Sequence, residues 1–224
     1  MKLVSRKELH VSSTVGVYVA RKAPYLKLAK LAVKRFKFLN GYDAQVVTEE
    51  QCRPVVRSNW LKAFIWDVVP PSVDRIVYLD LDTFLFRPFD EFPDVPFAAV
   101  HDIMNTFMSE KACVGALGEL TAYFNSGVMI VRRDAKKVFD EAKKWVDKPC
   151  GGCVDQSRLN LIVHSMLGGF HPLPSEWNWF LSRERPVDPI VMHMVGMFSN
   201  HERVSALQTL ARMFENVKNI KSDW

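Results

Sequence analysis

The sequence lacks several features that would place it in a class at once. It has no apolar run approaching the roughly 18 residues that a membrane-spanning helix needs. Residues 1–10 are mixed in charge rather than apolar, so we expect no secretory signal peptide. No internal repeat, low-complexity tract or shift in composition marks a linker in the 224 residues. We therefore expect a soluble, cytoplasmic protein forming a single domain over residues 1–224.

Cysteine is scarce, with four residues in the chain. Cys150 and Cys153 form a pair that resembles a metal or redox motif. However, a structural zinc ion needs four ligands, and no second pair lies at a matching spacing. We interpret the cysteines as incidental thiols, which fits a reducing compartment.

Positive charge is concentrated at the start of the chain. Residues 1–62 carry 13 Lys and Arg against 4 Asp and Glu, whereas residues 63–224 carry 17 against 21. A basic first quarter suits polyanions, which include nucleic acid, anionic lipid and the diphosphate of an activated sugar. Part of this charge forms one face of an expected amphipathic helix, made of Lys27, Lys30, Lys34 and Lys37. Such a face is typical of a solvated helix, and peripheral contact with a membrane or an acidic partner is the alternative.

Strand and helix patterns alternate along the chain. The strands are expected at Val15–Ala20, Asp43–Thr48, Arg75–Leu79, Phe97–Val100 and Ser126–Val131. The helices are expected at Tyr25–Leu39, Asn59–Val69, Asp134–Val146, Gln156–Leu167 and Arg203–Phe214. This alternation predicts an α/β fold, with a central, mostly parallel sheet flanked by helices.

Two carboxylates follow the clearest strand of the chain. Arg75–Leu79 runs directly into Asp80, Leu81 and Asp82. Ligands of open α/β sheets bind beyond the carboxyl ends of strands. Because residues two apart on an extended chain point the same way, Asp80 and Asp82 can face one ion. Paired carboxylates hold a hard divalent cation and leave positions open for phosphate oxygens, so the pair predicts a site for a metal-bound phosphate.

Two other interpretations of this pair remain. In the first, the aspartates only cap a turn. In the second, the chain is a phosphatase of the haloacid dehalogenase type, whose Asp-x-Asp begins with the nucleophile. Those phosphatases carry Thr four residues after that Asp, where this chain has Phe84, and Thr83 is one residue early. Their motif also usually opens the chain, so the metal site is favoured.

Four later segments combine polar residues with turns. They are Phe124-Asn125-Ser126-Gly127-Val128-Met129, Asp155-Gln156-Ser157-Arg158-Leu159-Asn160, Leu173-Pro174-Ser175-Glu176-Trp177-Asn178-Trp179 and His193-Met194-Val195-Gly196. Together with the Asp-x-Asp, their order and spacing resemble the GT-A-fold glycosyltransferases, most closely the family 8 type that includes glycogenin and bacterial galactosyltransferases. The resemblance runs from Lys62 to Gly196. Residues 1–50 match only as a generic strand–helix–strand start.

The resemblance implies a metal-bound nucleotide sugar. Asp80, Asp82 and His193 would hold Mn²⁺, with Mg²⁺ as the alternative, and the ion would bridge the two phosphates of a UDP-sugar. The other implied donor-binding positions are Lys62, Leu81, Asp102, Asn125, Ser126 and Gly196, with Tyr18 and Arg21 as candidates near the first strand. Residues 1–82 would form the nucleotide-binding half, and residues 83–224 the half that holds the donor sugar and acceptor.

The resemblance also implies the chemistry, which is transfer of a hexose to a hydroxyl acceptor such as a glycan, with retention. Asp155 and Gln156 would lie under the donor sugar and stabilise an oxocarbenium-like state. An inverting enzyme would instead need a carboxylate base, with Glu176 or Asp155 as candidates. The acceptor side would be shaped by Trp177, Asn178 and Trp179, because sugar C–H faces pack well on aromatic rings.

Each of these residues also has a structural alternative. His193 could be a buried histidine satisfied by backbone, Asp102 and Asn125 could serve their own turns, and Asp155 could cap a helix. Trp177 and Trp179 could both belong to the core.

The sequence departs from the family at Ser199, where the family has a lysine that clamps the diphosphate. That role would pass to His201 or Arg203, or the loop would be built differently. Two other classes of function remain open: a module that binds a nucleotide sugar or glycan without turnover, and a protein that binds nucleic acid or a membrane surface. The lysine face has no interleaved aromatic residues, so we expect no nucleic-acid partner.

Overall fold

The computed structural model describes residues 13–20, 23–52, 58–102, 120, 122–146, 155–180, 188–194, 205 and 209. Several expected features lie outside these residues: Arg21, the pair Cys150 and Cys153, Gly196, Ser199, His201, Arg203 and most of the helix Arg203–Phe214. Within the described ranges, no helix combines the length and the apolar character needed to cross a bilayer.

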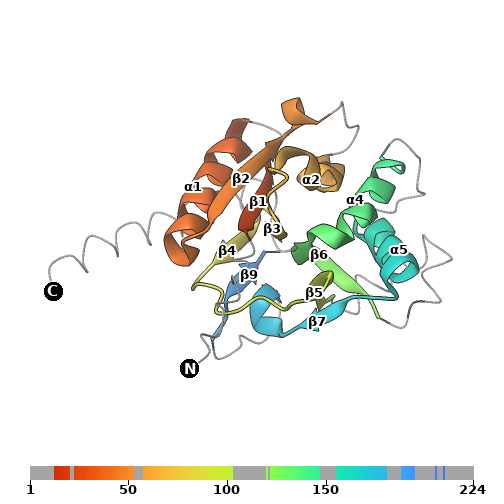
Figure 1. Ribbon diagram of the computed structural model, residues 1–224. Coiled ribbons are helices and arrows are strands. Elements are labelled where there is room, and N and C mark those ends of the chain that lie inside the picture. The colour runs from red at the N-terminus through yellow and green to blue at the C-terminus, as the bar shows by residue number, and fades with distance from the viewer. Residues whose placement is uncertain are drawn as a thin grey trace, which may run out of the picture.

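The central sheet contains six strands in the order β2-β1-β3-β6-β5-β7 (Figure 1). Their bounds are β1 Thr14–Ala20, β2 Asp43–Thr48, β3 Arg75–Leu79, β5 Phe97–His101, β6 Phe124–Arg132 and β7 His171–Leu173. The pairings β1–β2, β1–β3 and β5–β7 are parallel, whereas β6 is antiparallel to both β3 and β5. The expected mostly parallel sheet is confirmed, with β6 as the reversed strand.

Helices bury both faces of this sheet (Figure 1). They are α1 Ala23–Asn40, α2 Ile65–Val68, α4 Lys136–Lys143 and α5 Asp155–Leu167. On β3, Val77 and Leu79 pack into the cluster that includes Phe36 of α1, whereas Ile76 and Tyr78 pack into the cluster of α2, α4 and α5. A strand covered on both faces is apolar along its whole length, which explains the continuous apolar pattern of β3.

The helix expected over Asn59–Val69 has a different geometry. Ser58–Phe64 forms a 3₁₀ helix, and only Ile65–Val68 is α-helical. Trp60, Leu61 and Ala63 are all buried there, so the segment is enclosed rather than amphipathic. The lysines of α1 behave as expected of a polar face, because all four are exposed.

A second, three-stranded sheet was not predicted from the sequence. It contains β4 Thr83–Leu85, β9 Val191–His193 and β8 Trp179–Phe180, in the order β4-β9-β8. Thr83 lies opposite His193 in the antiparallel β4–β9 pair, and the backbone N–H of Met194 donates to the Asp82 carbonyl at 3.0 Å. This small sheet brings the end of the described chain to the Asp-x-Asp turn.

Candidate active site

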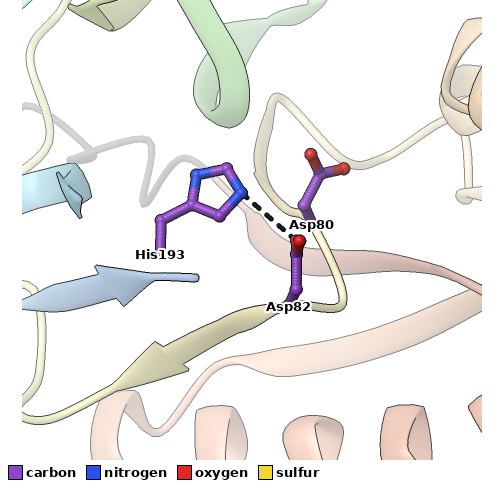
Figure 2. A group of neighbouring side chains, drawn as sticks. All are labelled: Asp80, Asp82 and His193. Carbon is purple, nitrogen blue, oxygen red and sulfur yellow. Dashed lines mark hydrogen bonds and ion pairs between the residues drawn. The ribbon is translucent and has the colours of Figure 1, made fainter. Parts of the chain in front are cut away.

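Asp80, Asp82 and His193 converge at the junction of the two sheets (Figure 2). Asp80 directly follows β3, Asp82 lies in the turn before β4, and His193 is the last residue of β9. One ligand atom from each of the three lies within 4.8 Å of the others, and His193 Nε2 is 3.2 Å from Asp82 Oδ1. Two carboxylates and an imidazole form a donor set that suits a divalent transition metal. The predicted ligands thus lie together in a group that fits such an ion.

Gly127 of β6 leaves the space that His193 occupies. A Cβ atom at this glycine would lie 2.0 Å from His193 Cε1 and 2.6 Å from His193 Nδ1. The φ angle of Gly127 is not positive, so the residue is required for space and not for backbone conformation. The glycine of the Asn-Ser-Gly-Val motif is therefore part of the architecture around His193.

Lys62 lies beside these ligands as a buried cation. Its side-chain Nζ is 2.6 Å from Asp155 Oδ2 and 3.6 Å from Asp80 Oδ1, and it donates to Ser126 Oγ at 3.0 Å. Burial would lower the pKa of Lys62, but the attraction of Asp155 and Asp80 outweighs burial and raises that pKa above its ordinary value. Lys62 therefore stays charged and links the metal group to the start of α5.

Tyr78 holds one oxygen of Asp80. The two residues are two apart at the end of β3, and the Tyr78 hydroxyl donates to Asp80 Oδ1 at 2.5 Å. Burial raises the pKa of Asp80, Lys62 opposes that shift, and Asp82 adds to it. Burial and the charge of Asp80 raise the pKa of Tyr78 well above its ordinary value, so the phenol remains a donor. The group thus contains a partly buried carboxyl whose charge a bound cation would stabilise.

A continuous set of hydrogen bonds connects β5, β6 and α5 next to the metal group. Gln156 Nε2 donates to Asp102 Oδ2 at 2.6 Å, and Gln156 Oε1 accepts from the Ser126 N–H at 2.9 Å. Asn125 Nδ2 donates to Asp102 Oδ1 at 3.4 Å. All four of these residues are buried. Asp102, Asn125, Ser126 and Gln156, far apart in sequence, form one polar wall.

A family model described as glycosyl transferase family 8 matches residues 5–208, which is most of the chain. The chain belongs to glycosyl transferase family 8. The resemblance of its motifs to this family is thereby confirmed, and so is the GT-A fold.

Solved glycosyltransferases share the fold of this family 8 chain. A glycosyltransferase involved in glycosylation of the major capsid of PBCV-1 matches with a TM-score of 0.62 and 15% identity, covering 88% of this chain and 98% of that one. The galactosyltransferase LgtC, solved with donor and acceptor sugar analogues, matches with a TM-score of 0.60 and 18% identity, covering 89% and 95%. Mouse xyloside xylosyltransferase 1 matches with a TM-score of 0.52 and 15% identity, covering 80% and 97%.

Sequence similarity extends to a plant protein. The chain is 31% identical over 87 residues to a probable galacturonosyltransferase-like 4 of Arabidopsis thaliana, and the match covers 33% of this chain. The chain spans only a quarter, 25%, of the length of that relative.

In this family 8 chain, a groove open to solvent lies between α1 and β4. Tyr18 and Leu81, both predicted to bind the donor, line it together with Leu28, Leu31, Ala32, Arg35, Thr83, Phe84 and Leu85. Leu81 separates the two aspartates in sequence, so the groove adjoins the metal group.

The residues predicted for the acceptor side lie in different surroundings. Trp177 is half-buried, with its ring 4.9 Å from that of Phe89. Trp179 packs in an apolar cluster with Phe84. Asn178 is 1% exposed and lies between Asn125 and His193. Of the three, Trp177 has the largest share of its surface available to a ligand.

Sequence reasoning missed two residues that hold the site together. Tyr78 carried a usable signal, because a residue two before Asp80 on a strand points to the same side. Asn160 fixes α5 against β6, since its side-chain amide pairs with both the N–H and the carbonyl of Phe124, at 2.8 and 2.9 Å. In the sequence, Asn160 stands out only as the last residue of the Asp155–Asn160 motif.

Proposed function

We propose that this family 8 glycosyltransferase transfers a hexose-type sugar from a UDP-sugar to a hydroxyl acceptor, with retention of anomeric configuration, and that it depends on Mn²⁺. The observation that carries this proposal is the convergence of Asp80, Asp82 and His193 next to the buried cation of Lys62. Carboxylates with an imidazole suit Mn²⁺ better than Mg²⁺ or Ca²⁺, and a neighbouring cation favours a polyanionic donor.

The three ligands would hold the ion so that phosphate oxygens take its remaining positions. When bound, the metal supplies Lewis acidity that stabilises charge on the departing diphosphate. Lys62 would add a positive charge beside the metal group, and its position is already fixed before a donor binds. Its ion pairs with Asp80 and Asp155 keep it within reach of the group, and positioning of this kind supplies much of the rate.

The polar wall is the proposed seat of the donor sugar. Asp102 and Asn125 offer oxygen and amide groups to sugar hydroxyls. Asp155 and Gln156, at the start of α5, would lie under the ring and stabilise an oxocarbenium-like state. The ion pair of Asp155 with Lys62, at 2.6 Å, directs this carboxylate to a cation and not to an acceptor hydroxyl, which supports the proposal of retention.

Binding of the nucleoside and of the acceptor is proposed from the remaining surfaces. Ligand sites are concave and mostly apolar, which fits the groove beside Tyr18 and Leu81 as a nucleoside site. The half-buried ring of Trp177 suits the C–H face of an acceptor sugar. We also propose donor contacts for Arg21, from its place near the first strand, and for Gly196, from the family motif that contains it.

The decisive experiment is a screen of nucleotide sugars for Mn²⁺-dependent release of UDP. The panel includes UDP-glucose, UDP-galactose and, because of the name of the plant relative, UDP-galacturonic acid. Asp82→Ala and His193→Ala are expected to lose activity and metal dependence. Asp90→Ala and His171→Ala, which change exposed residues of the same types, serve as controls and should keep both.

Two results would overturn the proposal. If Asp82→Ala and His193→Ala match the wild type, the metal assignment is wrong. If no UDP is released from any donor although the protein binds UDP, the chain is a binding module. Tight, steeply salt-dependent polyanion binding that survives both substitutions would instead favour the nucleic-acid or membrane-surface alternative.

A further inference from the structure

His193 is held on the side facing away from Asp82 by Asn178. The Asn178 Oδ1 atom lies 3.0 Å from His193 Nδ1, and the His193 ring stacks on Phe180 with centroids 5.8 Å apart. Asn178 is 1% exposed and His193 3%, so water does not compete for this contact. The other ring nitrogen, Nε2, faces Asp82.

The hydrogen bonds beyond Asn178 fix the direction of its amide. The Gly127 backbone N–H, which can only donate, points at Asn125 Oδ1 at 2.9 Å. The other polar side-chain atom of Asn125 lies near Asp102 Oδ1. An ionised carboxylate oxygen can only accept a hydrogen bond, so this atom of Asn125 is the amide nitrogen. Asn125 therefore presents its oxygen to Asn178, and Asn178 must answer with its NH₂ group, at 2.9 Å.

This leaves the oxygen of Asn178 facing His193. An amide oxygen accepts a hydrogen bond, so His193 Nδ1 must carry the proton. A neutral imidazole with a proton on Nδ1 has its lone pair on Nε2. That lone pair would point to the space shared with Asp80 and Asp82, where a metal ion would replace any proton that Nε2 shares with Asp82 Oδ1, 3.2 Å away.

We propose that Asn178 is a positioning residue that fixes the tautomer and the ring orientation of His193, so that Nε2 is ready for the metal before the metal arrives. The inference rests on the proposed metal site. It gives Asn178 a role distinct from acceptor contact, since its amide acts through His193. Partners of this kind orient metal-binding histidines and account for part of the metal affinity.

The first test measures Mn²⁺ affinity by the electron paramagnetic resonance signal of free Mn²⁺. Asn178→Ala removes the acceptor and should weaken binding about 10–100-fold. Asn178→Asp keeps an oxygen for the Nδ1 proton while losing the donor to Asn125, so it should retain most of the affinity despite lower stability. Asn40→Ala is the control, because the Asn40 amide likewise makes two hydrogen bonds, here to the backbone of Phe36 and Phe89, but has no contact with His193. It should lower stability and leave Mn²⁺ affinity unchanged.

The second test measures the tautomer in the wild-type protein and uses a variant only to assign the signal. Protein labelled with ¹⁵N-histidine and freed of metal is studied by NMR at about pH 8.5, roughly two units above the ordinary histidine pKa. His193, assigned by comparison with His193→Ala, should show its proton on Nδ1. A proton on Nε2 with none on Nδ1, or equal Mn²⁺ affinity of Asn178→Ala and the wild type, overturns the inference. A wild-type protein that binds no Mn²⁺ overturns the proposed metal site instead, and the NMR result still decides the role of Asn178.

Discussion

Gly127→Ala is the substitution whose effect follows most directly from the geometry. The added Cβ would lie 2.0 Å from His193 Cε1. Because non-bonded carbon atoms pack about 3.5–4.0 Å apart, the ring or the strand must move by about 1.5–2 Å. Overpacking of this kind costs about 1–3 kcal/mol of stability. Metal coordination tolerates displacements of only about 0.2 Å, so His193 is expected to be lost as a ligand.

The expected result is a loss of Mn²⁺ affinity at least as large as the roughly 10–100-fold that follows loss of an outer partner. Titration with Mn²⁺, followed by electron paramagnetic resonance, measures the affinity, and urea unfolding measures the stability. Gly16→Ala is the matched control, since its Cβ would lie 2.7 Å from Phe36 in the core. It should lower stability without changing Mn²⁺ affinity per folded molecule.

A double-mutant cycle separates the clash with the ring from other effects. In a His193→Ala background the ring is absent, so Gly127→Ala should lose most of its cost in stability. If Gly127→Ala binds Mn²⁺ as the wild type does, or if its cost is the same in both backgrounds, the reasoning about this glycine is refuted.

Two further predictions concern the buried charges. Lys62→Met should lower the free energy of unfolding by about 3–5 kcal/mol in urea, because Asp155 loses its buried counter-charge. Lys144→Met is the control, because it breaks a solvent-accessible ion pair with Glu141 at the same 2.6 Å and should cost less than about 1 kcal/mol. Equal losses of stability in the two variants would contradict the role of Lys62 as the counter-charge of Asp155. Asp80→Asn should abolish tight Mn²⁺ binding yet raise the melting temperature of the metal-free protein at pH 7, as measured by calorimetry in chelator. Burial raises the pKa of Asp80 in the folded protein above its unfolded value. The free energy of unfolding therefore decreases as the pH rises above about 3.9, because the folded protein must give up a proton that it binds more tightly than the unfolded chain does. Asn does not ionise, so Asp80→Asn should remove this decrease. A lower melting temperature for Asp80→Asn at pH 7 would show that the charged carboxylate of Asp80 stabilises the metal-free protein, which would contradict this prediction.

Much of the central sheet was predictable because β1, β3 and β6 are largely buried runs of five to nine residues. β3 was predicted with its observed bounds, and the two carboxylates that follow it needed only the rule that strand ends carry ligands. His193 was predicted from the order of the family motifs, since no local pattern marks it as a ligand.

The small sheet was hidden because its strands are too short to show a period. β8 has two residues and β9 has three, so neither repeats an alternation that a sequence could display. Pairing with β4 is a long-range contact, and it alone determines that His193 reaches Asp82. The contact of Asn178 with His193 joins segments 15 positions apart, and no local pattern in the sequence predicts it.

The pairing of β4 with β9 also sets when the site can come into existence. His193 and Asp82 are 111 positions apart in sequence, although their ligand atoms lie 3.2 Å apart. At a synthesis rate of about 5–20 residues per second, the imidazole leaves the ribosome roughly 5–20 s after the carboxylates. A nascent chain that already displays both aspartates thus has an incomplete ligand set. Once bound, an ion at the proposed site would tie these distant segments together, contributing about 2.7 kcal/mol at one hundred times its dissociation constant. Retention of metal would then report that β9 has docked.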